Sequence, residues 1–118
     1  VIILKGHHTI VTGADGIQYI NNTGNPGMAS GGSGDVLAGM ISAFAARGMS
    51  EADAAIAAVY LHGLAGDIAA EKYGENSLIP SDIIQNISVA FLSCMQQIPV
   101  DKQKKICYNK RDEFYFGI

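Results

Sequence analysis

The chain has 118 residues, which is enough for one small domain with a modest hydrophobic core. Hydrophobic residues make up 48% and charged residues only 16%, a balance that excludes a disordered chain. The formal net charge of −3 offers no basic surface, so we expect no nucleic-acid partner.

The first twenty residues predict short strands. Residues 1–4 form a continuous apolar run, which is typical of a strand buried on both faces. Because a chain rarely begins inside a core strand, we expect the C-terminal part of a longer protein whose neighbouring strands are missing here. Residues 9–12 and 17–20 predict the two strands of a hairpin, joined by a turn at Asp15 and Gly16.

Three helices are expected after the glycine-rich residues 21–34. The first covers about residues 35–46 and stops near Gly48. The second begins after Ser50, runs to about residue 73 and ends at Gly74. The third begins at Pro80 with Ser81 as its N-cap. One face of the third helix carries an apolar stripe made of Ile83, Ile87, Phe91, Cys94 and Ile98.

Two glycines, Gly63 and Gly66, fall inside the second predicted helix, where each costs about 1 kcal/mol relative to alanine. We therefore expect something to approach this helix closely. Tight packing of a neighbouring helix and contact with a ligand remain equally open.

The chain divides into two predicted parts. Residues 1–100 form the predicted domain, and residues 101–118 form a charged tail that we expect to be solvated or loosely docked.

The two cysteines, Cys94 and Cys107, do not have the spacing of a metal site. They could form one disulfide, but reduced thiols of an intracellular protein are favoured. Neither a secretory signal nor a membrane-spanning segment is visible, so we expect a cytoplasmic protein without a membrane partner.

The stretch from Thr23 to Asp35 predicts an anion site, because five of its thirteen residues are glycine and a helix follows at once. The backbone N–H groups of Gly32, Ser33 and Gly34 could converge on a phosphoryl group there. Asp35 would then accept a proton from a hydroxyl that attacks the phosphorus. A glycine-rich turn with Asp35 as a first-turn acid that complements the helix dipole is an equally good interpretation. The stretch has neither the Walker pattern nor a dinucleotide-binding fingerprint.

A second candidate segment, residues 5–9, follows the first strand, where ligands gather in open α/β sheets. Lys5 could contact a phosphate and Thr9 could donate a hydrogen bond. His7 and His8 are adjacent on an extended segment, so we expect them to face opposite ways and not to share a metal ion. His62 on the second helix is more often a packing residue than a ligand.

Three segments together resemble one family. They are Lys5 to Thr9, Thr23 to Leu37 with its Asn-Pro-Gly-Met-Ala lead-in, and Val59 to Asp67. In this order they are similar to the C-terminal portion of the NAD(P)H-hydrate dehydratases, which belong to the ribokinase-like superfamily, and the resemblance covers about residues 1–90. It implies the α/β class and a three-layer α/β/α domain, of which this chain supplies the hairpin strands and about three helices.

The resemblance also implies an activity, which is nucleotide-dependent dehydration of the S-epimer of NAD(P)H hydrate back to NAD(P)H. ADP or ATP would be the co-substrate, Mg²⁺ the cofactor, and a homo-oligomer formed through the exposed face of the long helix the expected assembly. Asp35 would be catalytic and would face the hydrate with Asn25, while Gly32, Ser33 and Gly34 would form the anion hole. The implied nucleotide contacts are Lys5, Gly6, His7, His8, Thr9 and Gly34.

Two other readings stay open. A ribokinase-like kinase that acts on a small molecule, for example the alcohol of a vitamin precursor, shares the Gly-Ser-Gly-Asp end of the loop. A non-catalytic nucleotide-binding or assembly fragment is the second alternative. The nicotinamide-hydrate pocket and the acidic residues that place Mg²⁺ are expected from sequence that precedes Val1.

Overall fold

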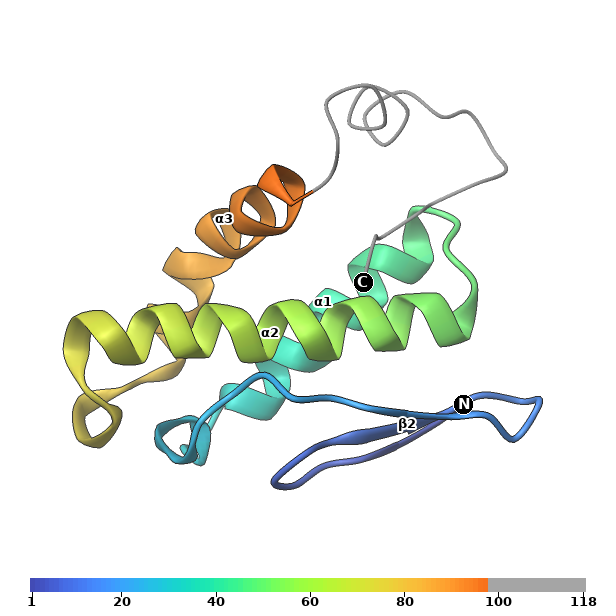
Figure 1. Cartoon of the computed structure of the whole chain (residues 1–118), viewed down its shortest axis with the longest axis horizontal. Coiled ribbons are helices and arrows are strands. Elements are labelled where there is room, and N and C mark those ends of the chain that lie inside the picture. Colours follow the sequence, from blue (N-terminus) through green and yellow to red (C-terminus); the bar gives the residue numbers. More distant parts are fainter. Residues whose placement is uncertain (98–118) are drawn as a thin grey trace.

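The computed structural model describes residues 1–97, and the predicted tail and Ile98 lie outside them. Three short strands come first: β1 (Ile2–Leu4), β2 (Ile10–Thr12) and β3 (Gln18–Ile20). Three helices follow: α1 (Ser33–Ala46), α2 (Glu51–Tyr73) and α3 (Pro80–Gln96). Two short 3₁₀ turns, η1 (Pro26–Met28) and η2 (Glu75–Ser77), flank the helices. The long helix α2 runs through the middle, with the sheet on one side and α1 and α3 packed against it (Figure 1).

The three strands form an antiparallel sheet in the order β1-β2-β3. Val11, at the centre, pairs with Ile3 on one side and with Tyr19 on the other. Val11 faces the helices and is only 2% exposed. The alternate residues of β1 face away from the helices, and Ile2 and Leu4 are 69% and 66% exposed. The prediction that residues 1–4 are buried on both faces is therefore wrong for the described chain, because helices cover only one face of the sheet.

The predicted hairpin between β2 and β3 is confirmed. Gly16 has a φ of 80°, in the left-handed region that glycine adopts readily. Its N–H donates to the Gly13 carbonyl at 3.0 Å, and Asp15 Oδ1 accepts from the Ile17 N–H at 3.0 Å. A local turn thus sets the register of both strands.

The ends of α1 and α2 lie close to the predicted ones. α1 begins at Ser33, two residues earlier than expected, because Gly32 with a φ of 96° lets the chain turn directly into the helix. At the start of α2, the Ser50 hydroxyl accepts from the Asp53 N–H at 3.2 Å. Gly48 and Gly74, both with positive φ, follow the two helices as predicted.

The start of α3 differs from the prediction. Ser81 is not the N-cap; Ile79 occupies that position and Pro80 is the first helical residue. Proline suits the first position of a helix because its missing N–H would have no helical partner there. The Asp82 carboxylate accepts from the Ile79 N–H at 3.0 Å, which replaces the serine cap.

The core lies between the three helices and the inner face of the sheet. Leu61, Ile83 and Val11 are the largest fully buried side chains. The Phe44 and Phe91 rings meet edge-on with centroids 5.9 Å apart, and thus join α1 to α3. The described members of the predicted α3 stripe all belong to this core or pack against it: Ile83, Ile87, Phe91 and Cys94.

The oligomer surface expected on the long helix α2 stays a prediction, because a stripe of this helix is half-buried: Ile56, Tyr60, Leu64 and Ile68. α1, α3 and β2 all pack against it, and its exposed residues are confined to its two ends: Glu51, Asp53, Glu71, Lys72 and Tyr73. Large apolar side chains are exposed instead on α3, where Ile84, Val89 and Leu92 are 54%, 45% and 60% exposed. Within residues 1–97, no helix is both long enough and apolar enough to cross a membrane.

Candidate functional site

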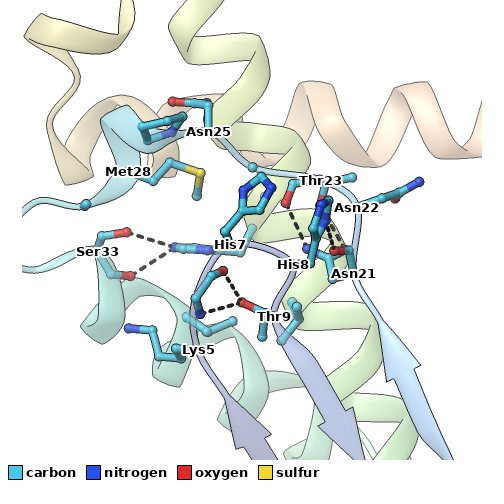
Figure 2. Close-up of a pocket in the computed structure, with 18 residues that line it drawn as sticks. Lys5, His7, His8, Thr9, Asn21, Asn22, Thr23, Asn25, Met28 and Ser33 are labelled. Carbon is cyan, nitrogen blue, oxygen red and sulfur yellow. Dashed lines mark hydrogen bonds between the residues drawn. The ribbon is translucent and has the colours of Figure 1, made fainter.

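A cavity of about 550 Å³ opens between the carboxyl end of β1 and the helices. Three parts of the chain line it: residues 5–9, residues 21–26 with Met28 and Ala29, and four helical side chains with Gly63. The helical side chains are Ser33, Leu37, Val59 and His62. Figure 2 shows Lys5 and Ser33 on one side of this cavity, and Asn21, Asn22 and Thr23 on another.

Residues 5–9 form a tight bend after β1. The Gly6 N–H lies 3.5 Å from Thr9 Oγ1, and the Thr9 hydroxyl donates to the Gly6 carbonyl at 3.3 Å. His8 has a φ of 57°, and its Nδ1 lies 3.3 Å from the Asn21 carbonyl. The bend therefore ties the end of β1 to the end of β3.

The structure contradicts the expected separation of His7 and His8. Their ring centroids lie only 4.0 Å apart, because the chain bends at these residues instead of continuing as a strand. Within residues 1–97 there is no group of three or more His, Cys, Asp or Glu side chains that could hold a metal ion. The pair thus forms part of the cavity wall.

The opposite wall is the segment from Thr23 to Met28, which docks on α2. The Thr23 hydroxyl donates to the Tyr60 carbonyl at 2.8 Å. The Asp67 carboxylate accepts from the Gly24 N–H at 2.8 Å and from Asn25 Nδ2 at 2.9 Å. These bonds connect residues about forty positions apart in the sequence.

This docking explains the glycines inside α2. A Cβ on Gly63 would lie 2.7 Å from the Thr23 carbonyl carbon, and a Cβ on Gly66 would lie 2.6 Å from Met28 Cε. Both distances are far below an ordinary van der Waals contact. The close neighbour is therefore the loop itself, and neither a neighbouring helix nor a ligand, the two expectations from the sequence.

Asn25 lines the cavity, but its side-chain amide already makes contacts within the protein. Its Oδ1 accepts from the Gly27 N–H at 3.1 Å and so caps η1, while Nδ2 donates to Asp67. One amide hydrogen is left for the substrate contact that the sequence predicts.

The start of α1 is held by His62. Its Nε2 lies 3.0 Å from the Ser33 carbonyl and 3.4 Å from Ser33 Oγ. Because a carbonyl only accepts, Nε2 must carry the hydrogen. Burial lowers the pKa of His62, the bond to Ser33 opposes this shift, and the charge of Lys5 lowers the pKa further. The imidazole therefore stays neutral near pH 7 and acts as a packing residue, which is the interpretation that the sequence favours.

The predicted anion hole and catalytic acid lie at the same helix start. Ser33 lines the cavity and is 6% exposed, whereas Asp35 is exposed and does not line it. The Ser33 N–H donates to the Ser30 carbonyl at 3.3 Å, so one of the three predicted donors already has a partner. Lys5 Nζ lies 2.8 Å from where a Cβ would stand on Gly34, which brings the ammonium to the first turn of α1.

The structure thus gathers most of the predicted residues. Lys5, Gly6, His7, His8, Thr9, Asn25 and Ser33 all line one cavity. Gly32, Gly34 and Asp35 do not line it, but the end of Lys5 occupies the space where a side chain on Gly34 would begin. Several wall residues were missed: Asn21, Asn22, Thr23, Met28 and Val59.

Asp67 was also missed, although a signal for it exists in the sequence. Gly63, Gly66 and Asp67 are three and four residues apart, so they lie on one face of a helix. A carboxylate beside two glycines on such a face predicts a polar segment packed against the backbone.

A sequence model of the NAD(P)H-hydrate dehydratases matches residues 1–89. The chain belongs to this family. The matched range includes the whole cavity and the start of α1, which are the parts that carry the predicted chemistry.

The relatives agree with this assignment. A bifunctional NAD(P)H-hydrate repair enzyme of Moorella thermoacetica is 48% identical over 84 residues, which are 71% of this chain and 16% of that protein. The counterpart in Thermofilum pendens is 52% identical over 77 residues, 65% of this chain and 15% of that protein. An ADP-dependent (S)-NAD(P)H-hydrate dehydratase of Neisseria meningitidis is 45% identical over 73 residues, 62% of this chain and 25% of its own length. The chain therefore spans only a small part of these relatives.

A solved structure shows the same fold. The ADP/ATP-dependent NAD(P)H-hydrate dehydratase of Bacillus subtilis, crystallised with ATP and Mg²⁺, superimposes with a TM-score of 0.72 at 30% identity. The superposition covers 76% of this chain and 32% of that one. The predicted α/β class is thereby confirmed, and the antiparallel strands and three helices described above are the part of that fold present here.

Proposed function

We propose that this chain forms the nucleotide-binding and phosphoryl-transfer part of a dehydratase that converts (S)-NAD(P)H hydrate back to NAD(P)H. One observation carries the proposal: the cavity lies between the bend of residues 5–9 and the start of α1, and Lys5 Nζ reaches that helix start. A lysine and the positive end of a helix dipole favour the same ligand, a phosphate. The names of the Neisseria and Xanthomonas relatives support ADP as the co-substrate.

In this proposal, the nucleotide binds to Lys5, Gly6, His7, His8, Thr9 and Gly34. The Lys5 ammonium neutralises charge on the phosphates, and Gly32, Ser33 and Gly34 surround the transferred phosphoryl group with backbone N–H groups. Because Gly34 has no side chain, Lys5 can lie against the helix start, where any Cβ would meet it at 2.8 Å. Gly34 therefore leaves room for the Lys5 ammonium beside the helix start.

Asp35 would be the proton acceptor. Its carboxylate takes the proton of the hydrate hydroxyl while that oxygen attacks the terminal phosphorus and the bond to the nucleotide breaks. Phosphate is a far better leaving group than hydroxide. The lone pair of the ring nitrogen then expels it, and loss of a ring proton restores the double bond of the reduced nicotinamide. The exposure of Asp35 supports this role, since its carboxylate is open to a substrate bound outside the described residues.

The described residues do not form a magnesium site of their own, because they contain no group of three or more His, Cys, Asp or Glu side chains around one point. We propose that Mg²⁺ arrives on the phosphates of the nucleotide. No step above is routed through it. We also propose a homo-oligomer, supported by the exposed apolar side chains of α3, and a cytoplasmic location, supported by the use of an adenine nucleotide.

The test is the Asp35→Asn variant of the protein that carries this chain. Turnover, followed by the returning absorbance of reduced nicotinamide, should fall by about 100-fold or more, with the Kd for ADP within about twofold of wild type. Glu51→Gln is the matched control, because Glu51 is likewise an exposed first-turn acid, on α2. If both variants lose only about 0.5 kcal/mol of stability and keep their turnover, Asp35 merely complements a helix dipole. A stable phosphorylated alcohol as the product would indicate a kinase instead.

A further inference from the structure

Asp67 lies on α2, outside the cavity, and its carboxylate makes two of the hydrogen bonds that hold the loop. One oxygen accepts from the Gly24 N–H at 2.8 Å, and the other accepts from Asn25 Nδ2 at 2.9 Å. Gly24 and Asn25 both line the cavity, whereas Asp67 does not. Asp67 therefore contacts the back of the cavity wall.

A carboxylate fits this position for a chemical reason. Both groups that point at it are donors, and only an ionised Asp or Glu can accept at two oxygens while donating nothing. Hydrogen bonds of this kind, from N–H groups to a charge, are stronger than neutral ones. Gly24 has a φ of 103°, which glycine adopts without steric cost, and in this conformation its N–H faces the carboxylate.

The loop makes other contacts on the same face of α2. Thr23 bonds to the Tyr60 carbonyl, and the Met28 side chain lies against Gly66. Asn25, held by Asp67 through Nδ2, uses its Oδ1 to cap η1 at Gly27. The Asp67 carboxylate thus supplies the hydrogen-bonded link between α2 and η1, beside the packing of Met28 on Gly66.

We propose that Asp67 is a positioning residue, which fixes residues 24–28 as the wall of the nucleotide cavity and so sets the affinity for the nucleotide. This inference rests on the proposed function. Without Asp67 the loop samples other conformations, and the apparent affinity falls in proportion to the fraction of molecules whose wall is in place. The rate of the chemical step in the saturated enzyme does not change, because Asp67 touches no reacting group.

Exchanging the side chains of Asp67 and Asn25 separates the positioning role of Asp67 from a general need for a carboxylate on α2. In the double variant Asp67→Asn/Asn25→Asp, the amide introduced on α2 can accept from the Gly24 N–H through its oxygen. Its nitrogen can donate to the carboxylate introduced on the loop, whose other oxygen can still accept from the Gly27 N–H. All three hydrogen bonds return with donor and acceptor reversed in one of them. In the single variant Asp67→Asn, by contrast, one amide group faces another donor.

The experiment measures ADP binding by calorimetry and turnover at saturating substrate in the protein that carries this chain. Asp67→Asn should raise the Kd and the KM for ADP by about tenfold, with kcat within about twofold of wild type. The double variant should return the Kd to within about threefold of wild type. Glu71→Gln is the control, because it removes one exposed carboxylate one turn further along the same helix and should change nothing.

Amide hydrogen exchange of residues 21–29 supplies a readout without nucleotide. Exchange at Gly24 should be faster in Asp67→Asn and slow again in the double variant. An unchanged Kd in Asp67→Asn, or a double variant no better than the single one, overturns the inference. If wild type does not bind ADP at all, the proposed function fails, and the exchange measurement still decides whether Asp67 holds the loop.

Discussion

Replacing Gly63 with alanine should destabilise the protein, although alanine is the better helix former. Gly63 lies in the middle of α2, where the helix meets the loop at Thr23. An added Cβ would stand 2.7 Å from the Thr23 carbonyl carbon and 2.8 Å from its oxygen. These are backbone atoms, so no side-chain rotation can relieve the clash.

The size of the effect follows from the contacts. The shortest ordinary carbon–carbon contact is 3.4 Å, so the loop must retreat by about 0.7 Å from its 2.7 Å position. That shift stretches the bond from Thr23 to the Tyr60 carbonyl, now 2.8 Å long, to the limit of a hydrogen bond. Lost bonding of about 1 kcal/mol and overpacking of about 1–3 kcal/mol outweigh the helix-propensity gain of about 1 kcal/mol. A net loss of about 2 kcal/mol lowers Tm by about 10 °C in a domain of this size.

Urea unfolding measures the loss, and Gly39→Ala is the matched control. Gly39 lies on α1, and a Cβ there would meet nothing within 4 Å. The same substitution should therefore gain about 1 kcal/mol at Gly39 and lose about 2 kcal/mol at Gly63. A Gly63→Ala protein as stable as wild type, beside a stabilised Gly39→Ala protein, would refute the close docking of the loop on α2.

Two further predictions concern the opposite side of the cavity. Burial keeps the pKa of His62 below its ordinary 6.5, so the unfolded chain binds a proton first and wild type loses stability as pH falls below 6.5. His62→Gln keeps a donor for the Ser33 carbonyl but cannot titrate. The unfolding free energy of wild type minus that of this variant should therefore be lower at about pH 5.5 than at about pH 7.5. The same difference in unfolding free energy at both pH values would contradict a neutral buried imidazole. Lys5→Met should raise the Kd for ADP by about tenfold and weaken its salt dependence, whereas Lys72→Met, at an exposed lysine of α2, should do neither.

The elements that could be predicted from the sequence are those set by local chemistry. The turn at Asp15 and Gly16, the cap at Ser50 and the stop at Gly74 each depend on residues within four positions of one another. Their physical signals are therefore contained in a short window. The start of α3 shows the limit, because Ser81 is a good capping residue but Pro80 and Asp82 together favour a cap two residues earlier.

The burial of β1 could not be predicted from its sequence. An apolar run shows that a strand can be buried on both faces, but it does not show which elements cover those faces. Ile2 and Leu4 are apolar, yet they face away from the helices. The pairing of His7 with His8 was missed for a related reason. Alternation of side chains holds only while the backbone stays extended, and the left-handed φ of His8 ends it.

The candidate site combines features set by local sequence with features set by distant contacts. The anion site expected at the loop stays a prediction, which the sequence supports because the first N–H groups of a helix have no partner within the helix. The docking of that loop on α2 could not be predicted, since its bonds join Thr23 to Tyr60 and Gly24 to Asp67 across about forty residues. Gly63, Gly66 and Asp67 on one face of α2 indicate that a polar segment packs there, but they do not identify which segment it is.

The same helix holds both walls of the cavity, and this explains its composition. His62 fixes the start of α1 through Ser33, and Asp67 fixes the loop through Gly24. Six of the eleven buried residues of α2 are alanines, and their short side chains let α1, α3 and the sheet approach closely. A substitution on α2 that widens this packing would move the two walls apart without touching a ligand. We therefore expect α2 to act on nucleotide affinity through the distance between Ser33 and Gly24, while the proposed nucleotide contacts themselves stay on the bend of residues 5–9 and at the start of α1.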